Sequence, residues 1–369
     1  MFNKHHLNKV IANALIAVAA VFALACSGQP VGQQNGGSTE SGAAMRLQGS
    51  GASFPKPIYE KWVSEYGKAN PNVSIDYQST GSGAGQNAII SKTVDFGASD
   101  EPMADADLQK AGGALLHIPT VLGAVVLTYN LADVKEPLRL TPEVISDIYL
   151  GKIRKWNDAK IKADNPNVNL PDADILPVFR SDASGTTAVF TDFLSKAVPE
   201  WKEKVGANKQ PSWITGVGTG APRNDGVMGQ VKQTPNSIGY VELTFAKANN
   251  LPTALIKNKA GQFVEPTLES VSAAAAGSVA SMPEDLRVAI THPDGADAYP
   301  IASYTYILVY KDQQDAAKGK ALADFLWWAI HDGEKYVKDL HYAPLPAEVV
   351  KKVEAKINSM TAGGKPLRQ

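Results

Sequence analysis

Three segments of this chain share one order of elements: a short predicted strand, a turn rich in glycine and hydroxyl side chains, and a predicted helix. The turns cover residues 49–54, 81–85 and 182–187. Strands that alternate with amphipathic helices are typical of the α/β class. The chain has 369 residues, which is more than one compact domain usually holds. We therefore expect two α/β lobes.

The other expected elements follow from hydrophobic periodicity and capping residues. The helix expected over 141–150 has the clearest limits, because Thr141 can cap it, Pro142 suits its first position and Gly151 follows it. Further helices are expected over 57–66, 82–91, 103–111, 316–330 and 347–357, and one opens at Ser184. Strands are expected over 73–77, 94–96, 124–129, 175–179, 240–242 and 303–310.

The N-terminus predicts an exported protein. Lys4 and Lys9 precede an apolar run over 11–25 that is too short to span a bilayer comfortably. A positive segment followed by a short apolar run indicates a secretory signal peptide, here residues 1–25. Residues 26–44 are rich in Gly, Ser and Gln, so they predict a flexible tether ahead of a folded body.

Two kinds of cleavage fit the end of the signal peptide. Ala23 and Ala25 suit ordinary signal peptidase, whereas Cys26 suits lipid attachment at a lipobox with Ala23 and Leu24 in swapped order. Cys26 is the single cysteine, so it cannot form an internal disulfide. Its position at the cleavage site favours lipidation of Cys26 and a membrane anchor.

The pattern of turns favours a small oxyanion as ligand. Each turn places backbone N–H groups and hydroxyls at a helix N-terminus, whose dipole attracts anions. Arg180 offers a planar fork for an oxyanion, and Asp182, two residues later, can orient the guanidinium. The simpler interpretation is ordinary turns and a weak surface ion pair. The sequence contains neither a Walker A motif nor a dinucleotide-binding glycine pattern, which argues against a nucleotide.

Other classes of function find little support. The formal net charge is −1, so bulk charge does not attract nucleic acid. The six histidines have no metal-ligand spacing, and no Gly-x-Ser-x-Gly motif occurs. We therefore expect no enzyme activity, no metal and no cofactor, although an enzyme acting on phosphate esters is the first alternative. Asp100 is a poor neighbour for an anion, and it can instead cap the helix expected over 103–111.

Six segments together resemble the periplasmic phosphate-binding proteins of phosphate ABC importers. They are residues 49–55 (GSGASFP), 95–100 (DFGASD), 147–153 (DIYLGKI), 180–187 (RSDASGTT), 224–226 (NDG) and 238–242 (IGYVE). The resemblance implies the type II periplasmic-binding-protein fold, with two α/β lobes joined by two hinge strands and the ligand in the cleft. We place lobe 1 at 45–121 and 300–369, lobe 2 at 122–299, and the strand crossings near 121–124 and 299–302.

The resemblance also implies a set of binding residues. The phosphate-binding residues it implies are Ser53, Phe54, Ser82, Asp100, Arg180, Ser184, Gly185 and Thr186. Asp182 would hold Arg180, and Asp100 would accept a hydrogen bond from a protonated phosphate oxygen. Two positions depart from the family: Ser53 stands where Thr is frequent, and Ala183 stands where Gly is frequent. Asp225 is left out of the direct contacts.

The implied partners are inorganic phosphate and the membrane permease of an ABC transporter, with the chain acting as a monomer. Sulfate carries no O–H near neutral pH, so its oxygen would face Asp100 lone pair to lone pair, and this disfavours sulfate. Ligand binding is expected to favour closed lobes, because each lobe holds part of the site. The remaining alternatives are a receptor for another oxyanion and a surface interaction protein on the same scaffold.

Overall fold

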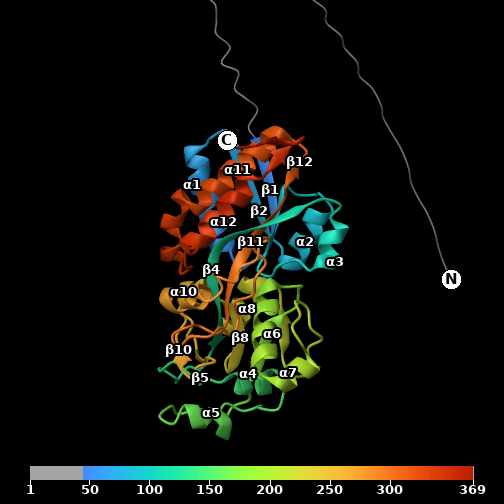
Figure 1. The fold of residues 1–369 in the computed structure, drawn as a ribbon. Coiled ribbons are helices and arrows are strands. Elements are labelled where there is room, and N and C mark those ends of the chain that lie inside the picture. The colour runs from blue at the N-terminus through green and yellow to red at the C-terminus, as the bar shows by residue number, and fades with distance from the viewer. Residues whose placement is uncertain (1–44, 369) are drawn as a thin grey trace, which may run out of the picture. The chain divides into compact units, whose positions relative to one another are not determined.

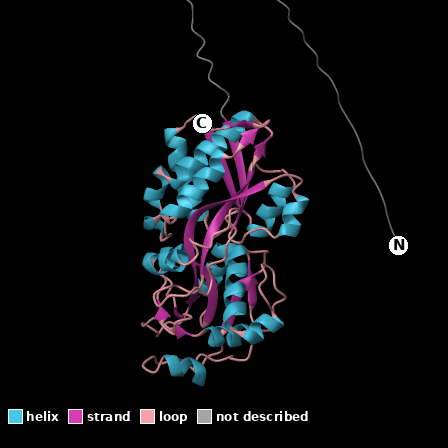
Figure 2. Ribbon diagram, in the orientation of Figure 1, coloured by secondary structure: helices cyan, strands magenta, loops and turns pink. Residues whose placement is uncertain are grey.

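The computed structural model describes residues 45–368; the expected signal peptide, the tether and Cys26 lie outside this range. A mixed sheet of eight strands runs through the described chain, in the order β2-β1-β3-β11-β4-β8-β6-β7 (Figures 1 and 2). Its strands are β1 (Met45–Gly51), β2 (Val73–Ser79), β3 (Phe96–Ser99), β4 (Leu115–Tyr129), β6 (Leu176–Arg180), β7 (Thr219–Ala221), β8 (Ser237–Glu242) and β11 (Ala302–Tyr310).

The remaining strands form two small sheets. One sheet contains β5 (Arg139–Leu140), β9 (Leu255–Lys257) and β10 (Phe263–Val264). The other contains β12 (Asp312–Gln313), β13 (Thr361–Ala362) and β14 (Lys365–Pro366). Two groups of helices surround the main sheet (Figure 1). The first contains α1 (Lys56–Ala69), α2 (Ser82–Ile90), α3 (Asp105–Lys110), α11 (Ala316–Ile330) and α12 (Ala347–Asn358), with short 3₁₀ turns η1 (Asp332–Tyr336) and η2 (Lys338–Leu340). The second contains α4 (Pro142–Tyr149), α5 (Ala159–Asp164), α6 (Gly185–Ala197), α7 (Pro199–Lys204), α8 (Arg223–Gln233), α9 (Leu243–Ala248) and α10 (Leu268–Ala276). Between residues 45 and 368, no helix has both the length and the apolar composition to cross a membrane.

Two antiparallel strands, β4 and β11, connect the two groups of helices. β4 is 15 residues long and extends from the side of α11 and α12 to the side of α6 and α8 (Figure 1). It pairs with β11 along its first part and with β8 along its last part. The change of partner comes where Ala302 lies opposite Ala124 and the Val125 N–H donates to the Ile301 carbonyl at 2.9 Å. The segments expected to cross therefore lie side by side.

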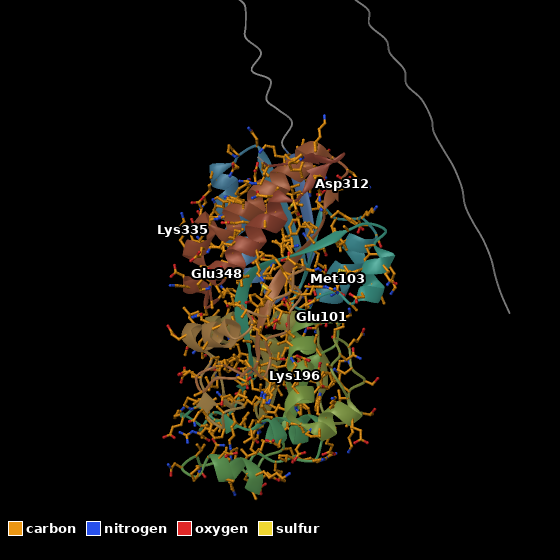
Figure 3. All side chains as sticks on the ribbon, viewed as in Figure 1. Glu101, Met103, Lys196, Asp312, Lys335 and Glu348 are labelled. Atoms are coloured by element: carbon orange, nitrogen blue, oxygen red, sulfur yellow. The ribbon has the colours of Figure 1, made fainter. Side chains whose placement is uncertain are left out.

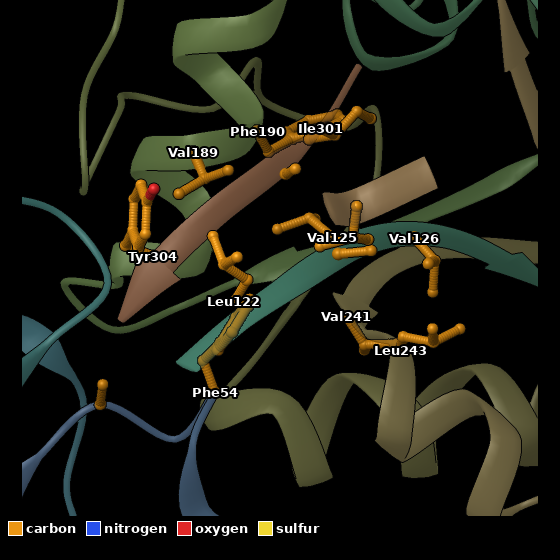
Figure 4. Close-up of a cluster of buried hydrophobic side chains, with 14 of the residues drawn as sticks. Phe54, Leu122, Val125, Val126, Val189, Phe190, Val241, Leu243, Ile301 and Tyr304 are labelled. Atoms are coloured by element: carbon orange, nitrogen blue, oxygen red, sulfur yellow. The ribbon is translucent and has the colours of Figure 1, made fainter. Parts of the chain in front are cut away.

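Buried side chains pack against β4 at the change of partner (Figure 4). Phe54, Leu122, Val125 and Val241 are all fully buried there. The Phe54 ring lies over Gly123, where a Cβ atom would come within 2.5 Å of the ring. Gly123 therefore lets the Phe54 side chain lie directly on the strand, which fixes the turn that follows β1.

The structure confirms the capping residues predicted for the helix over 141–150. The Thr141 hydroxyl accepts a hydrogen bond from the Val144 N–H at 3.2 Å, and Pro142 occupies the first position of α4. Gly151 has φ +72°, a conformation that glycine adopts without strain.

Several strand boundaries were predicted wrongly; β8, for example, begins at Ser237 and not at Tyr240. β3 begins at Phe96 and not at Val94, because residues 92–95 complete a turn in which Lys92 has φ +55°. β4 begins at Leu115 and not at Ala124, so the prediction missed its whole first part. That part contains His117 and Pro119, two residue types that are uncommon inside a buried strand.

His117 makes the stability of the fold sensitive to acid. It is 3% exposed, and its Nε2 accepts a hydrogen bond from the Met103 N–H at 3.0 Å. Burial, together with the charge of Arg287, lowers the pKa of His117 to about 4. Between about pH 6.5 and about pH 4 the unfolded chain binds a proton here that the native chain does not, so the free energy of unfolding falls by up to about 3 kcal/mol as pH decreases.

Urea unfolding at a series of pH values tests this expectation on the wild type and His117→Gln. The glutamine can still accept the Met103 hydrogen bond but does not titrate. The free energy of unfolding of the wild type, minus that of His117→Gln, should decrease as pH falls from about 6.5 to about 4. Parallel pH curves would show that His117 makes no such contribution.

Candidate anion-binding site

The glycine- and serine-rich turns lie together in the folded chain. The Ser82 hydroxyl accepts a weak hydrogen bond from the Asp100 N–H at 3.4 Å. A Cβ atom on Gly185 would come within 2.5 Å of the Ser82 hydroxyl and 2.7 Å of the Asp100 Cβ. Gly185 is the first residue of α6, so the absence of a side chain brings the N-terminus of that helix directly against Ser82 and Asp100. Every residue of the predicted set lies at the ends of β1, β3 and β6 or at the starts of α2 and α6.

Local sequence explains how the third turn is built. Ser184 caps α6, its hydroxyl accepting from the Thr187 N–H at 3.1 Å. Gly185 and Thr186 thereby present the first N–H groups of a 13-residue helix, whereas the Ser184 N–H donates to the Lys209 carbonyl at 2.9 Å. Ala183 does not have a positive φ, so the replacement of glycine there causes no strain. The departure at Ala183 is thus compatible with the turn.

Arg180 is buried and held by two residues of its own segment. Its side chain is 1% exposed; Nε donates to Asp182 Oδ1 at 2.8 Å and Nη2 donates to Oδ2 at 2.6 Å. Its Nη1 donates to the Thr186 hydroxyl at 3.3 Å. Burial alone would raise the pKa of Asp182, but the Arg180 hydrogen bonds and charge bring it below its usual value. The guanidinium is therefore fixed in one orientation, and this pair is not the exposed ion pair of the simpler interpretation.

Asp100 faces this positive cluster from the end of β3. It is 1% exposed, and Oδ1 accepts a hydrogen bond from the Thr305 hydroxyl at 2.9 Å. Its Oδ2 lies 3.5 Å from the Thr186 hydroxyl. The alternative role as a helix cap is wrong, because α3 begins at Asp105 and is preceded by Ala104. Burial raises the pKa of Asp100 to about 7, with Thr305 and Arg180 opposing the shift.

The raised pKa predicts a pH dependence of stability in the ligand-free protein. The native state holds a proton on Asp100 that the unfolded chain releases above about pH 4. The contribution of Asp100 to the free energy of unfolding therefore decreases as pH rises from about 4 to about 7, opposite in sign to the contribution of His117. The full effect is about 4 kcal/mol at most. Asp100→Asn should remove this slope, which urea unfolding across the same range would measure. An unchanged slope in the variant would contradict the expectation.

Asn224 is a site residue that the sequence analysis missed. It is fully buried, and its N–H and Nδ2 both donate to the Ser53 hydroxyl, at 3.1 and 3.0 Å. Nδ2 also donates to the Thr186 hydroxyl at 3.1 Å, so one amide joins the first and third turns. The motif at 224–226 contained this residue, but no pattern around it indicated its contacts. Asp225 instead pairs with Arg223 at 3.3 Å on the surface.

Further contacts join the turns across the site. The Gly83 N–H donates to the Ala183 carbonyl at 3.0 Å. Lys209 Nζ donates to Gln86 at 2.6 Å and lies 3.1 Å from the carboxylate of Glu101, which is labelled in Figure 3. Residues on the side of α2 and residues on the side of α6 are thus in direct contact around Asp100 and Arg180.

Comparisons with known proteins place these observations in a family. A family model described as the PBP superfamily domain matches residues 34–331. The phosphate-binding protein PstS of Pasteurella multocida is 45% identical over 329 residues, covering 88% of this chain and 94% of that protein. PstS of Methanocaldococcus jannaschii is 40% identical, covering 87% of each chain.

A solved structure supports the fold assignment. The phosphate-binding protein of Stenotrophomonas maltophilia matches with a TM-score of 0.68 and 20% identity, covering 85% of this chain and 94% of that one. This likeness confirms the predicted fold, the two-lobed α/β fold of type II periplasmic binding proteins. Together with the sequence identities, it shows that the chain belongs to the PstS family of phosphate-binding proteins.

Proposed function

We propose that this protein captures one inorganic phosphate ion between two lobes and delivers it to the membrane permease of an ABC transporter. The observation that carries the proposal is that a buried carboxyl, Asp100, and a buried guanidinium, Arg180, both contact the Thr186 hydroxyl in one cluster of hydroxyl and N–H donors. A carboxyl among anion-binding groups suits an anion that brings its own proton. Phosphate near neutral pH does so, and sulfate does not.

The binding groups divide between the two lobes. Ser53, Phe54, Ser82 and Asp100 precede the long strand β4, while Arg180, Ser184, Gly185 and Thr186 follow it. The N-termini of α2 and α6 favour negative charge between them. We propose lobe 1 over 45–121 and 300–369 and lobe 2 over 122–299, hinged at β4 and β11. Phosphate would then stabilise the closed state, because neither lobe alone completes its shell of donors.

The same proposal covers the location of the protein. We propose that residues 1–25 direct export, that Cys26 carries a lipid anchor and that 26–44 tether the receptor to the membrane. The motivation is the order of a positive segment, an apolar run and a single cysteine. Mass spectrometry of the protein purified from membranes would detect the acyl groups on Cys26, and a free N-terminal thiol would contradict lipidation.

Isothermal titration tests the binding function. The protein is unfolded and refolded to remove endogenous ligand, and is then titrated with phosphate and with sulfate. One-to-one binding of phosphate without heat from sulfate is the expected result. A folded protein that gives no heat with phosphate would reassign the site to another oxyanion, and bound metal after purification would favour an enzyme.

A further inference from the structure

A second buried carboxyl, Glu242, lies behind the proposed phosphate site. It is the last residue of β8, fully buried, and it lies opposite Val125 on β4. Its Oε2 accepts a hydrogen bond from the Thr244 N–H at 2.9 Å, which caps α9. Within residues 45–368, its Oε1 is buried and has no hydrogen-bond partner. An ionised carboxylate in such a place is costly, because one oxygen keeps none of the hydrogen bonds that water would supply.

The neighbouring phenol shows where the proton of this carboxyl lies. Tyr342 is fully buried, and its hydroxyl donates to the Phe54 carbonyl at 2.6 Å. The same hydroxyl oxygen lies 3.2 Å from Glu242 Oε2. A phenol has one proton, and the carbonyl of Phe54 has none to offer. The phenol proton goes to the nearer acceptor, the Phe54 carbonyl, so a proton on Glu242 Oε2 best satisfies the contact at 3.2 Å.

The electrostatic surroundings favour the same protonation state. Burial raises the pKa of Glu242 well above its usual value, the hydrogen bonds from Thr244 oppose the shift, and a negative charge on Asp100 raises it further. The titratable groups that act on Glu242 are thus a phenol and another acid, and neither brings a positive charge. The Thr244 hydroxyl is likewise uncharged, and it donates to the Leu340 carbonyl at 2.5 Å.

Glu242 belongs to a closed ring of hydrogen bonds that returns to the site. The Glu242 N–H donates to Asn224 Oδ1 at 2.9 Å, and Asn224 donates to the Ser53 hydroxyl at 3.0 Å. Ser53 is followed by Phe54, whose carbonyl accepts from Tyr342. Tyr342 then contacts Glu242 and closes the ring. The members come from both sides of β4, so the ring forms as a whole only when these parts are in contact.

We propose that Glu242 is a neutral carboxylic acid that acts as a positioning residue: through Tyr342 and Asn224 it holds Ser53 and Phe54 in place for the ligand. The proposal rests on phosphate binding at Ser53 and Phe54. The Tyr342 hydroxyl fixes the Phe54 carbonyl and hence the turn after β1, while Glu242 supplies the proton that keeps this hydroxyl oriented. Glu242 touches no ligand in this role.

Infrared spectroscopy tests the protonation state directly. The wild type at neutral pH should show the C=O stretch of a protonated carboxylic acid that Glu242→Gln lacks. Both proteins contain Asp100, so its bands cancel in the difference spectrum and the bands of residue 242 remain. A difference spectrum that shows the loss of a carboxylate band would mean that Glu242 is ionised, and would overturn the proposal.

Phosphate titration tests the positioning role with a matched pair of variants. Tyr342→Phe removes the donor to the Phe54 carbonyl and should weaken phosphate binding about tenfold, the effect of one unpaired buried acceptor in the site. Tyr299→Phe is the control, because Tyr299 is an equally buried tyrosine that donates to a backbone carbonyl, Val125, at 3.0 Å but lies outside the ring. It should leave the affinity within about twofold.

The possible outcomes separate this inference from the proposed function. Equal affinities in Tyr342→Phe and Tyr299→Phe would overturn the positioning role. A wild type that binds no phosphate would refute the proposed function, while the infrared difference would still decide whether Glu242 is neutral. If Glu242→Gln does not fold, the infrared difference between the wild type and Tyr342→Phe replaces it, because loss of the Tyr342 oxygen should shift the frequency of a Glu242 carboxylic-acid band.

Discussion

Replacing Arg180 by methionine is expected to weaken phosphate binding at least about thirtyfold. The side chain is 1% exposed and its orientation is fixed by two hydrogen bonds to Asp182. Methionine keeps the buried volume but removes a pre-oriented fork that can form two charge-assisted hydrogen bonds with one oxyanion. Loss of one partner of a buried charged pair costs about 2–5 kcal/mol, which corresponds to this loss of affinity.

Isothermal titration with phosphate measures the effect, and Arg180→Lys is the matched control. Lysine keeps the positive charge but not the planar fork, so its affinity should lie between those of the wild type and Arg180→Met. The pKa of Asp182 should rise in Arg180→Met, since the group that lowers it is gone. An affinity within about tenfold of the wild type in a folded Arg180→Met protein would place the phosphate elsewhere.

Replacing Asp100 by asparagine is expected to reduce the preference for phosphate over sulfate by about ten- to a hundredfold. Above about pH 7, where the Asp100 carboxyl of the wild type is ionised, a sulfate oxygen would face the Asp100 oxygens without a proton between them. An unpaired buried acceptor costs about 1–3 kcal/mol, and like charges add to this. Asparagine can turn its NH₂ group toward a sulfate oxygen, which removes the repulsion, and it leaves phosphate with a neutral acceptor.

Competition titrations of phosphate and sulfate on the refolded wild type and Asp100→Asn measure the ratio of the two affinities. Ser303→Ala is a suitable control, because Ser303 donates to the backbone carbonyl of Asp100 at 3.1 Å and leaves its carboxyl unchanged. It should keep the selectivity of the wild type. If Asp100→Asn still rejected sulfate as strongly as the wild type, discrimination would have to come from other groups in the cluster.

The parts of the fold that could be predicted are those with a local cause. Thr141, Pro142 and Gly151 define α4 because each acts on its own backbone neighbours. The first half of β4 escaped prediction because it is a strand through its pairing with β11, where Tyr306 lies opposite Pro119. Proline and histidine in a buried strand contradict the usual preferences, and only the partner strand resolves the conflict.

The residues of the site can be divided in the same way, into those whose contacts are local in the sequence and those whose contacts are distant. Arg180 and Asp182 stand two residues apart on one extended segment, so their contact follows from the sequence. Asn224 reaches Ser53 across 171 positions of the chain, and Tyr342 reaches Phe54 across 288. No spacing rule connects residues so far apart. Such residues become visible only when the strands bring their segments together, which is why the contacts of Asn224 and Tyr342 were missed.

The order of strands in the main sheet has a consequence for how the chain is made. β3 lies between β1 and β11, and Tyr306 of β11 pairs with Ser99. During synthesis, the first three strands therefore lack their neighbour until residues beyond 302 have left the ribosome. Pairing between such distant segments is slow, because the loop between them must close first. The segment 122–299 can fold earlier, since its strands β6, β7 and β8 pair with one another. Strands β1, β2 and β3 therefore wait for β11 to complete their sheet, whereas the strands of 122–299 do not.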